Sequence, residues 1–268
     1  MTALAEKAAE NLMTLRKNKP LIHNITNYVV MNYTANALLA MGASPVMAHA
    51  RNEVEDMVAF AGALVLNIGT LTDGWVESMV AAGKKASRLD TPIVLDPVGS
   101  GATPLRTNSA KRIISSTRIS VIRGNASEIL SLRDDNSKTK GVDSIHSVDD
   151  AAEAARNLAE ELNTTLAITG PVDLVTDGRR VLRVSNGHSL MAYVTGTGCT
   201  ATATIGAFLA VDNDALGATA TALAFFGLAG EIAAESASAP GTFMIKLLDA
   251  LYTITPGILK DKCKIEGE

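Results

Sequence analysis

Short apolar stretches rich in β-branched residues alternate with longer segments of helical spacing through the first two thirds of the chain. The β-branched stretches lie at residues 63–69, 92–99, 119–125 and 165–170. The segments between them carry apolar residues three and four positions apart, as one face of a helix requires. This alternation predicts an α/β fold with a mostly parallel central sheet flanked by helices on both faces.

Three of the helical segments begin at residues that suit a helix N-cap. Asp73, Thr103 and Ser147 each stand at the start of such a segment. A side-chain oxygen at this position accepts a hydrogen bond from a backbone N–H group of the first turn. We therefore expect helices to begin at these three residues.

The pattern changes twice in the last hundred residues. The segments "DLVTDG" and "RVLRVSNG" predict a hairpin that turns at Asp177-Gly178, which we expect at an edge of the sheet. Helices then follow one another, over residues 197–211, 213–238 and 241–253. No linker rich in Gly, Pro or Ser and no internal repeat interrupts residues 1–268, so we expect a single domain.

Composition narrows the class of protein. The 268 residues are 47% hydrophobic and carry a net charge of −4, with Lys and Arg scattered and aromatics at 4%, which speaks against a nucleic-acid-binding groove. Residues 215–230 form the most apolar stretch, but it is alanine-rich and short for a membrane span. The two cysteines, Cys199 and Cys263, show neither zinc-ligand nor disulfide spacing, so a cytoplasmic location is expected.

Polar residues gather where the predicted strands end. Asp96 ends one strand, Arg123 ends the next and is followed by Glu128, and Thr169 ends a third. Ligands of parallel sheets bind at the carboxyl ends of the strands. Carboxylates suit Mg²⁺ and its waters, and arginine suits phosphate, so this set could hold magnesium and a polyphosphate. Each residue taken alone could instead be an ordinary turn or helix cap.

A glycine-rich loop leads directly into the predicted helix at residues 197–211. The sequence "GTGCT" places Gly196, Thr197, Gly198 and Cys199 at the helix start. The chain lacks a Walker A motif and a GxGxxG fingerprint, which leaves this loop as the leading anion site. Backbone N–H groups at a helix start point toward negative charge, and glycines let a ligand approach closely.

Cys199 allows more than one interpretation. In the first turn of a helix the dipole lowers the pKa of a thiol, which would suit a nucleophile or a base. A lone cysteine is otherwise most often a small buried residue. No histidine lies near Cys199 in the sequence to form a Cys-His pair.

Six motifs in one order resemble the hydroxyethylthiazole kinase family, the thiamine-salvage members of the ribokinase-like kinases. The motifs are "PLIHNITNYVVMNYTANALLAMGASPVMAHA", "GALVLNIGTL", "VLDPVGSGATPLRT", "IRGNASEI", "AITGPVD" and "VTGTGCTATATIGAF". They extend from about Pro20 to about Ile254. The resemblance implies a ribokinase-like fold for the whole of this region.

The resemblance also implies a reaction and an assembly. The reaction is transfer of the γ-phosphoryl group of ATP, with Mg²⁺, to the primary hydroxyl of 5-(2-hydroxyethyl)-4-methylthiazole, and the assembly is a homotrimer with active sites between subunits. Matching the motifs residue by residue assigns Asn27, Met47 and Gly196 to the thiazole, Arg123 and Thr169 to ATP, and Asp96 and Glu128 to magnesium. Gly196, Thr197, Gly198 and Cys199 form the expected anion hole. Cys199 is the expected catalytic residue, which lies near the acceptor hydroxyl and helps it lose its proton, while the loop amides carry more of the catalysis.

Three other functions compete with this one. A ribokinase-like kinase could act on another small heteroaromatic alcohol, such as hydroxymethylpyrimidine, although Cys199 and the "SPVM" segment favour a thiazole. A non-catalytic trimer could bind nucleotide or thiazole without turnover. A cysteine-dependent hydrolase is the third. Sugar kinases of this fold usually carry an aspartate where Cys199 stands, so the strength of the base is open.

Overall fold

A computed structural model describes residues 3–133 and 148–267, and of residues 148–151 the backbone alone. These residues contain a nine-stranded sheet. Its strands are β1 (Leu21–Ile25), β2 (Ser44–Val46), β3 (Ala63–Asn67), β4 (Ile93–Asp96), β5 (Val121–Gly124), β6 (Thr165–Ile168), β7 (Asp173–Thr176), β8 (Val181–Val184) and β9 (Ile265–Gly267). They lie side by side in the order β2-β1-β3-β4-β5-β6-β7-β8-β9.

The sheet is parallel from β2 to β6 and antiparallel from β6 to β9. The predicted mostly parallel sheet is therefore confirmed. The hairpin is also confirmed, since β7 and β8 pair on either side of the turn at Asp177-Gly178. Its expected place at the sheet edge is wrong, because β9 pairs with β8 and forms the edge itself.

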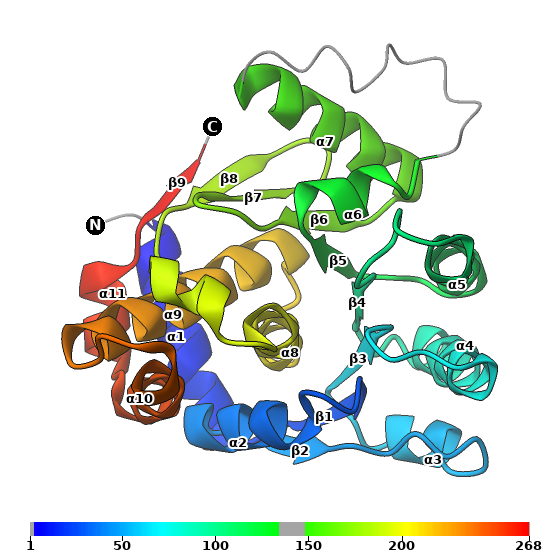
Figure 1. Cartoon of the computed structure of the whole chain (residues 1–268), viewed down its shortest axis with the longest axis horizontal. Coiled ribbons are helices and arrows are strands. Elements are labelled where there is room, and N and C mark those ends of the chain that lie inside the picture. The colour runs from blue at the N-terminus through cyan, green and yellow to red at the C-terminus, as the bar shows by residue number, and fades with distance from the viewer. Residues whose placement is uncertain (1–2, 134–147, 268) are drawn as a thin grey trace.

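Helices cover both faces of the sheet (Figure 1). One face carries α1 (Ala3–Asn18), α2 (Met31–Met41), α8 (Thr197–Leu209), α9 (Ala215–Glu235), α10 (Pro240–Thr253) and α11 (Pro256–Lys262). The other carries α3 (Val54–Val58), α4 (Asp73–Arg88), α5 (Pro104–Ser116), α6 (Ala126–Leu130) and α7 (Val148–Leu162). A short 3-10 helix, η2 (Ser189–Tyr193), precedes α8.

The helix α9 is long and apolar enough to cross a membrane by length and composition. However, 83% of its apolar stretch is buried inside the protein, as is typical of the core helix of a soluble protein. In the described part of the chain, only α10 and α11 taken together also pass this test, and they are bent by 109°. The apolar composition of α9 therefore reflects its place in the core.

The helix α8 lies directly on the sheet because small residues line it. A Cβ atom on residue 206 would lie 2.7 Å from Val65 Cγ2, so only glycine lets the helix backbone approach β3 this closely. Alanine, threonine and glycine fill most of the remaining positions of α8. The helix therefore brings its N-terminus to the carboxyl ends of the strands.

Two of the three predicted helix caps can be compared with the structure. The Thr103 side chain caps α5 by accepting a hydrogen bond from Arg106 N, as expected. The cap of α4 is Thr72, whose Oγ1 accepts from Trp75 N at 3.3 Å, whereas Asp73 is the first residue inside the helix. The prediction for α4 is therefore wrong by one position. Ser147 lies outside the described residues.

We expect Thr72→Ala to lower the free energy of unfolding by about 1 kcal/mol, because the substitution removes a capping hydrogen bond. Asp73→Ala loses only a favourable interaction with the helix dipole, and we expect a loss of about 0.3 kcal/mol. Urea denaturation of both variants at neutral pH measures the difference. A larger loss for Asp73→Ala than for Thr72→Ala would contradict this assignment of the cap.

Candidate active site

Polar residues from three neighbouring strands meet at the carboxyl edge of the sheet. Asn67 ends β3 and pairs in register with Asp96, which ends β4. Asn27 follows the end of β1, which pairs with β3 on its other side. These three side chains are between 1% and 4% exposed. The fold therefore brings together two predicted site residues, Asn27 and Asp96, around a third that the sequence analysis missed.

Hydrogen bonds hold one oxygen of the Asp96 carboxylate and leave the other free. Oδ2 accepts from Asn67 Nδ2 and from Thr202 Oγ1, both at 2.8 Å. Oδ1 is buried and has no hydrogen-bond partner among the described residues. A buried carboxylate oxygen without a donor is costly unless a cation or a proton satisfies it.

The Asp96 carboxyl titrates well above its ordinary range. Burial raises its pKa from 3.8 to about 6, against the opposing effects of the Arg123 guanidinium and the Thr202 hydrogen bond. Arg123 Nη1 lies 3.9 Å from Asp96 Oδ2, too far for a close ion pair. Without a bound cation, the negative charge of the Asp96 carboxylate is therefore only partly balanced by Arg123 and the two hydrogen-bond donors.

The network continues from Asn67 to the cysteine. Asn27 Nδ2 donates to Asn67 Oδ1 at 2.8 Å and lies 3.4 Å from Cys199 Sγ. Asn27 Oδ1 accepts from Val29 N, which fixes the orientation of the Asn27 amide. One line of contacts therefore joins Cys199, Asn27, Asn67 and Asp96.

The glycine-rich loop has the shape of an anion site. Gly196 is the N-cap of α8 with φ of 83°, and a Cβ atom there would lie 2.5 Å from Val30 Cγ1, so the position requires glycine. Among the described residues, the backbone N–H groups of Gly198 and Cys199 meet no backbone acceptor. Free N–H groups at the start of a 13-residue helix attract negative charge.

Cys199 stands in the first turn of α8, as expected, but its thiol is not activated. Burial raises the pKa of the Cys199 thiol above its ordinary value of 9.0, and the negative charge of Asp96 raises it further. The expected lowering of this pKa is therefore not found, because burial and the neighbouring carboxylate disfavour the thiolate. At neutral pH Cys199 is a neutral thiol.

Arg123 and Thr169 lie together, as predicted. Arg123 Nη2 donates to Thr169 Oγ1 at 2.6 Å, and Thr169 N donates to Gly124 O at 2.9 Å. The guanidinium lies against Gly198, where a Cβ atom would be 2.5 Å from Arg123 Nη1. Arg123 and Thr169, the predicted contacts for ATP, therefore lie beside the glycine-rich loop.

A cavity of about 630 Å³ opens next to this arginine. Its walls come from the strand ends, the segment before α8 and the helix α9, and they include Arg123, Thr169, Asp173, Asn186, Gly198 and Phe226. The sequence analysis missed Asp173, whose pKa burial raises to about 6, and the buried Asn186. Asn186 follows β8, so its position after a strand could have identified it, whereas Asp173 is the first residue of β7 and carries no such signal.

Glu128 makes local hydrogen bonds. Its carboxylate accepts from Asn125 N at 2.9 Å within a capping box of α6, and from Gly99 N at 2.8 Å on the loop after β4. No group of three His, Cys, Asp or Glu side chains suited to a metal ion occurs in the described ranges. Mg²⁺, however, needs only one or two carboxylates beside water and phosphate, and the free oxygen of Asp96 fits that role.

Met47 stands apart from the other predicted residues. It follows β2, the strand at the outer edge of the sheet, and is half-buried. No hydrogen bond or ring contact links it to Asn27 or Cys199. Because β2 runs parallel to β1, Met47 lies at the carboxyl ends of the strands, as Asn27 does.

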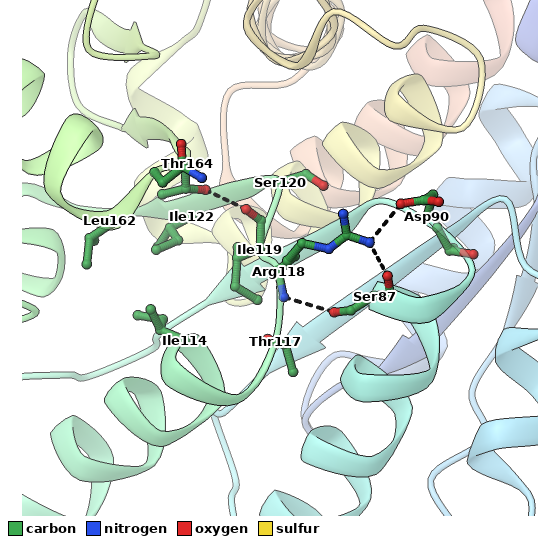
Figure 2. A pocket seen from close by; sticks show the side chains of 12 residues that line it. Ser87, Asp90, Ile114, Thr117, Arg118, Ile119, Ser120, Ile122, Leu162 and Thr164 are labelled. Atoms are coloured by element: carbon green, nitrogen blue, oxygen red, sulfur yellow. Dashed lines mark hydrogen bonds and ion pairs between the residues drawn. The ribbon is translucent and has the colours of Figure 1, made fainter.

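A second cavity, of about 350 Å³, lies at the opposite edge of the sheet (Figure 2). Its residues include Ser120 and Thr164, which precede β5 and β6. Arg118 in its wall is paired with Asp90 at 2.7 Å and donates to the Ser87 carbonyl at the end of α4. This cavity lies away from the carboxyl ends of the strands, so we do not assign the reaction to it.

Known proteins match this chain over almost its whole length. The model of the hydroxyethylthiazole kinase family matches residues 12–257. A hydroxyethylthiazole kinase from Desulfotalea psychrophila is 67% identical over 266 residues, which cover 99% of this chain and 97% of that protein. The structure of a hydroxyethylthiazole kinase from Pyrococcus horikoshii is similar with a TM-score of 0.90 at 48% identity, over 98% of this chain and 99% of that one.

A more distant structure bears on the fold alone. A ribokinase-like superfamily protein from Enterococcus faecalis is 13% identical, with a TM-score of 0.64 over 92% of this chain and 95% of that one. The ribokinase-like fold expected from the sequence motifs is therefore confirmed.

The pKa of Asp96 predicts a pH-dependent stability. Because the folded-state pKa is raised, neutral Asp96 stabilises the fold below pH 3.8, and this contribution is lost as the pH rises through about 6. We expect Asp96→Asn, measured in EDTA, to gain about 3 kcal/mol of unfolding free energy relative to the natural chain across this range. Urea denaturation at several pH values measures the gain.

Asp249→Asn on the exposed side of α10 is the surface control, and we expect it to follow the pH dependence of the natural chain. Parallel pH profiles for Asp96→Asn and the natural chain would contradict the assignment of this titration to Asp96.

Proposed function

Because the chain belongs to the hydroxyethylthiazole kinase family, we propose that its residues phosphorylate a thiazole alcohol at the N-terminus of α8. The enzyme is a phosphotransferase of thiamine salvage that uses ATP. In this proposal the acceptor is 5-(2-hydroxyethyl)-4-methylthiazole and the reacting group is its primary hydroxyl. The observation that carries the proposal is the line of contacts from Cys199 to Asp96 beside the free amides of the glycine-rich loop.

The acceptor lies on the β1 side of α8. Asn27 and Gly196 contact the thiazole alcohol, and Met47 packs its thioether against the ring. The buried Asn27 and the neutral Cys199 thiol contact each other at 3.4 Å and together offer a small polar group beside them two polar partners. This arrangement directs the hydroxyl of the acceptor toward the start of α8.

The nucleotide occupies the cavity on the β5 and β6 side. Arg123 and Thr169 contact ATP, and the cavity of about 630 Å³ has room for a nucleotide base and sugar. In the predicted anion hole of Gly196, Thr197, Gly198 and Cys199, the free N–H groups of Gly198 and Cys199 stabilise the phosphoryl group during transfer. The N–H of Thr197 instead donates to Val194 O at 3.4 Å. Because Arg123 lies against Gly198, its charge adds to that of the free N–H groups.

Asp96 and Glu128 organise Mg²⁺ in this proposal, directly or through water. The unpartnered Oδ1 of Asp96 supports a direct ligand, and the remaining lone pairs of Glu128 support contacts through water. Bound magnesium neutralises charge on the phosphates of ATP. Asn67 and Thr202 hold the Asp96 carboxylate in one orientation for this role.

Cys199 positions the acceptor hydroxyl rather than acting as a strong base. A neutral thiol offers a weak hydrogen bond, and phosphoryl transfer through a loose transition state needs chiefly positioning and charge neutralisation. The hydroxyl keeps its proton until late in the transfer and then gives it to an oxygen of the phosphoryl group. No phosphocysteine forms.

The assembly and location follow the family. We propose one ribokinase-like domain over residues 1–268, a homotrimer with active sites between subunits, and a cytoplasmic location. Exposed apolar residues on two packed helices support an interface, namely Leu39 of α2 and Ile245 and Tyr252 of α10. In this proposal the half-buried Met47, which follows the edge strand β2, contacts a neighbouring subunit.

The substrate is tested with the purified chain, ATP and Mg²⁺. We expect the highest kcat/KM with the thiazole alcohol, well above hydroxymethylpyrimidine and a pyridine alcohol of similar size, measured by coupled detection of ADP. A pyrimidine alcohol as the best acceptor would contradict the proposed substrate. Nucleotide and thiazole binding without ADP production would instead indicate a non-catalytic trimer.

The role of Cys199 is tested by two substitutions. We expect Cys199→Ala to lower kcat by less than about 100-fold, which is the smallest effect typical of losing a general base. Cys199→Asp supplies a stronger base at the same place and should retain activity. Complete loss of activity in both variants would contradict a positioning role and indicate an essential covalent thiol.

A further inference from the structure

We propose that Asn67 couples the acceptor side of the site to the nucleotide side, so that each substrate strengthens the binding of the other. This inference rests on the proposed function, because it takes Asn27 as an acceptor contact and Asp96 as the residue that faces the magnesium nucleotide. Asn67 itself touches neither substrate and is a positioning residue.

Asn67 stands between the two sides of the site. It is the last residue of β3, with β1 and Asn27 on one side and β4 and Asp96 on the other. The side chain is 1% exposed, so no water competes for its polar atoms. A change in the hydrogen bonds of Asn27 therefore reaches Asp96, and the reverse, through the side-chain amide of Asn67.

The amide of Asn67 uses both its ends. Oδ1 accepts from Asn27 Nδ2 at 2.8 Å and from Gly69 N at 2.9 Å, whereas Nδ2 donates to Asp96 Oδ2 at 2.8 Å. The backbone N–H of Gly69 can only donate, so the orientation of the amide is fixed. A carboxylate cannot donate and an alkyl group can do neither, so asparagine is required for all three bonds.

Close packing keeps the two amides in contact. A Cβ atom on Gly69 would lie 2.7 Å from Asn27 Nδ2, so Asn27 lies directly against the turn that follows Asn67. The same Nδ2 lies 3.4 Å from Cys199 Sγ, at the start of α8. A shift of Asn27 toward a bound acceptor therefore changes its hydrogen bond to Asn67.

Hydrogen bonds in series strengthen one another. When the magnesium nucleotide holds the Asp96 carboxylate in place, Oδ2 stays fixed as the acceptor of Asn67 Nδ2, and the Asn67 amide keeps Oδ1 aligned for Asn27. Asn27 is then held in the orientation that meets the thiazole alcohol. By linkage, an acceptor that orders Asn27 strengthens binding of the magnesium nucleotide by the same factor.

The test is a binding measurement that needs no turnover. Isothermal titration gives the Kd of the thiazole alcohol with and without Mg²⁺ and a non-hydrolysable ATP analogue. For the natural chain we expect the two values to differ by about 10-fold, within the usual range of coupling between sites. For Asn67→Ala and the similarly sized, apolar Asn67→Leu we expect the ratio to fall below about twofold, as lost coupling requires.

Thr202→Val is the matched control. It removes the other donor to Asp96 Oδ2 but leaves the chain from Asn27 through Asn67 to Asp96 intact. We expect weaker nucleotide binding in this variant with the coupling ratio retained. Circular dichroism and the fluorescence of Trp75, the single tryptophan, establish that each variant is folded. If Asn67→Ala does not fold, Asn67→Leu, which keeps the volume but no polar atom, carries the comparison.

Two results would overturn the proposal. The first is that the Kd of the thiazole alcohol in the natural chain does not change when the nucleotide analogue is added. The second is that a folded Asn67 variant keeps the same ratio of the two Kd values as the natural chain. If the natural chain binds no thiazole alcohol at all, the proposed function fails together with this inference. Tight binding of both ligands without coupling refutes the inference alone.

Discussion

A carboxylate that is 1% exposed at the end of β4 must be matched by donors or by a cation, and this need organises the carboxyl edge of the sheet. Asn67 of β3 and Thr202 of α8 supply two donors to Asp96 Oδ2, which ties the helix to the strands. The remaining oxygen is left without a partner. Burial and, after it, this same charge raise the pKa of the Cys199 thiol, which limits what the cysteine can do.

The small residues of α8 serve packing and chemistry together. Gly206 lets the helix lie on β3, which brings its N-terminus to the strand ends. Gly196 permits the left-handed backbone conformation that opens the helix, and Gly198 leaves room for the Arg123 guanidinium. The Arg123 charge, the free N–H groups and the cavity of about 630 Å³ therefore meet at the start of α8, because the residues there are glycine or have small side chains.

The sequence predicts the sheet wherever a strand is a continuous apolar run, as in β3 and β4. It misses β1, whose buried His23 and Asn24 interrupt the pattern, and the three-residue strands β2 and β9, which are too short to show one. In the site, strand ends identify Asp96, Arg123 and Thr169. The sequence does not identify Asn67 and Thr202 as site residues, because they lie 29 and 106 positions from Asp96, to which they are hydrogen-bonded. The thiazole follows from the family resemblance, not from spacing.

The most direct measurement is a crystal structure of the chain with the thiazole alcohol and a Mg²⁺-loaded, non-hydrolysable ATP analogue. The acceptor hydroxyl should lie between Cys199 and the terminal phosphate, with that phosphate over the amides of Gly198 and Cys199. Asp96 should turn its free oxygen toward the magnesium while keeping its bonds to Asn67 and Thr202. A terminal phosphate bound away from the start of α8, or an Asp96 that leaves Asn67, would contradict this arrangement.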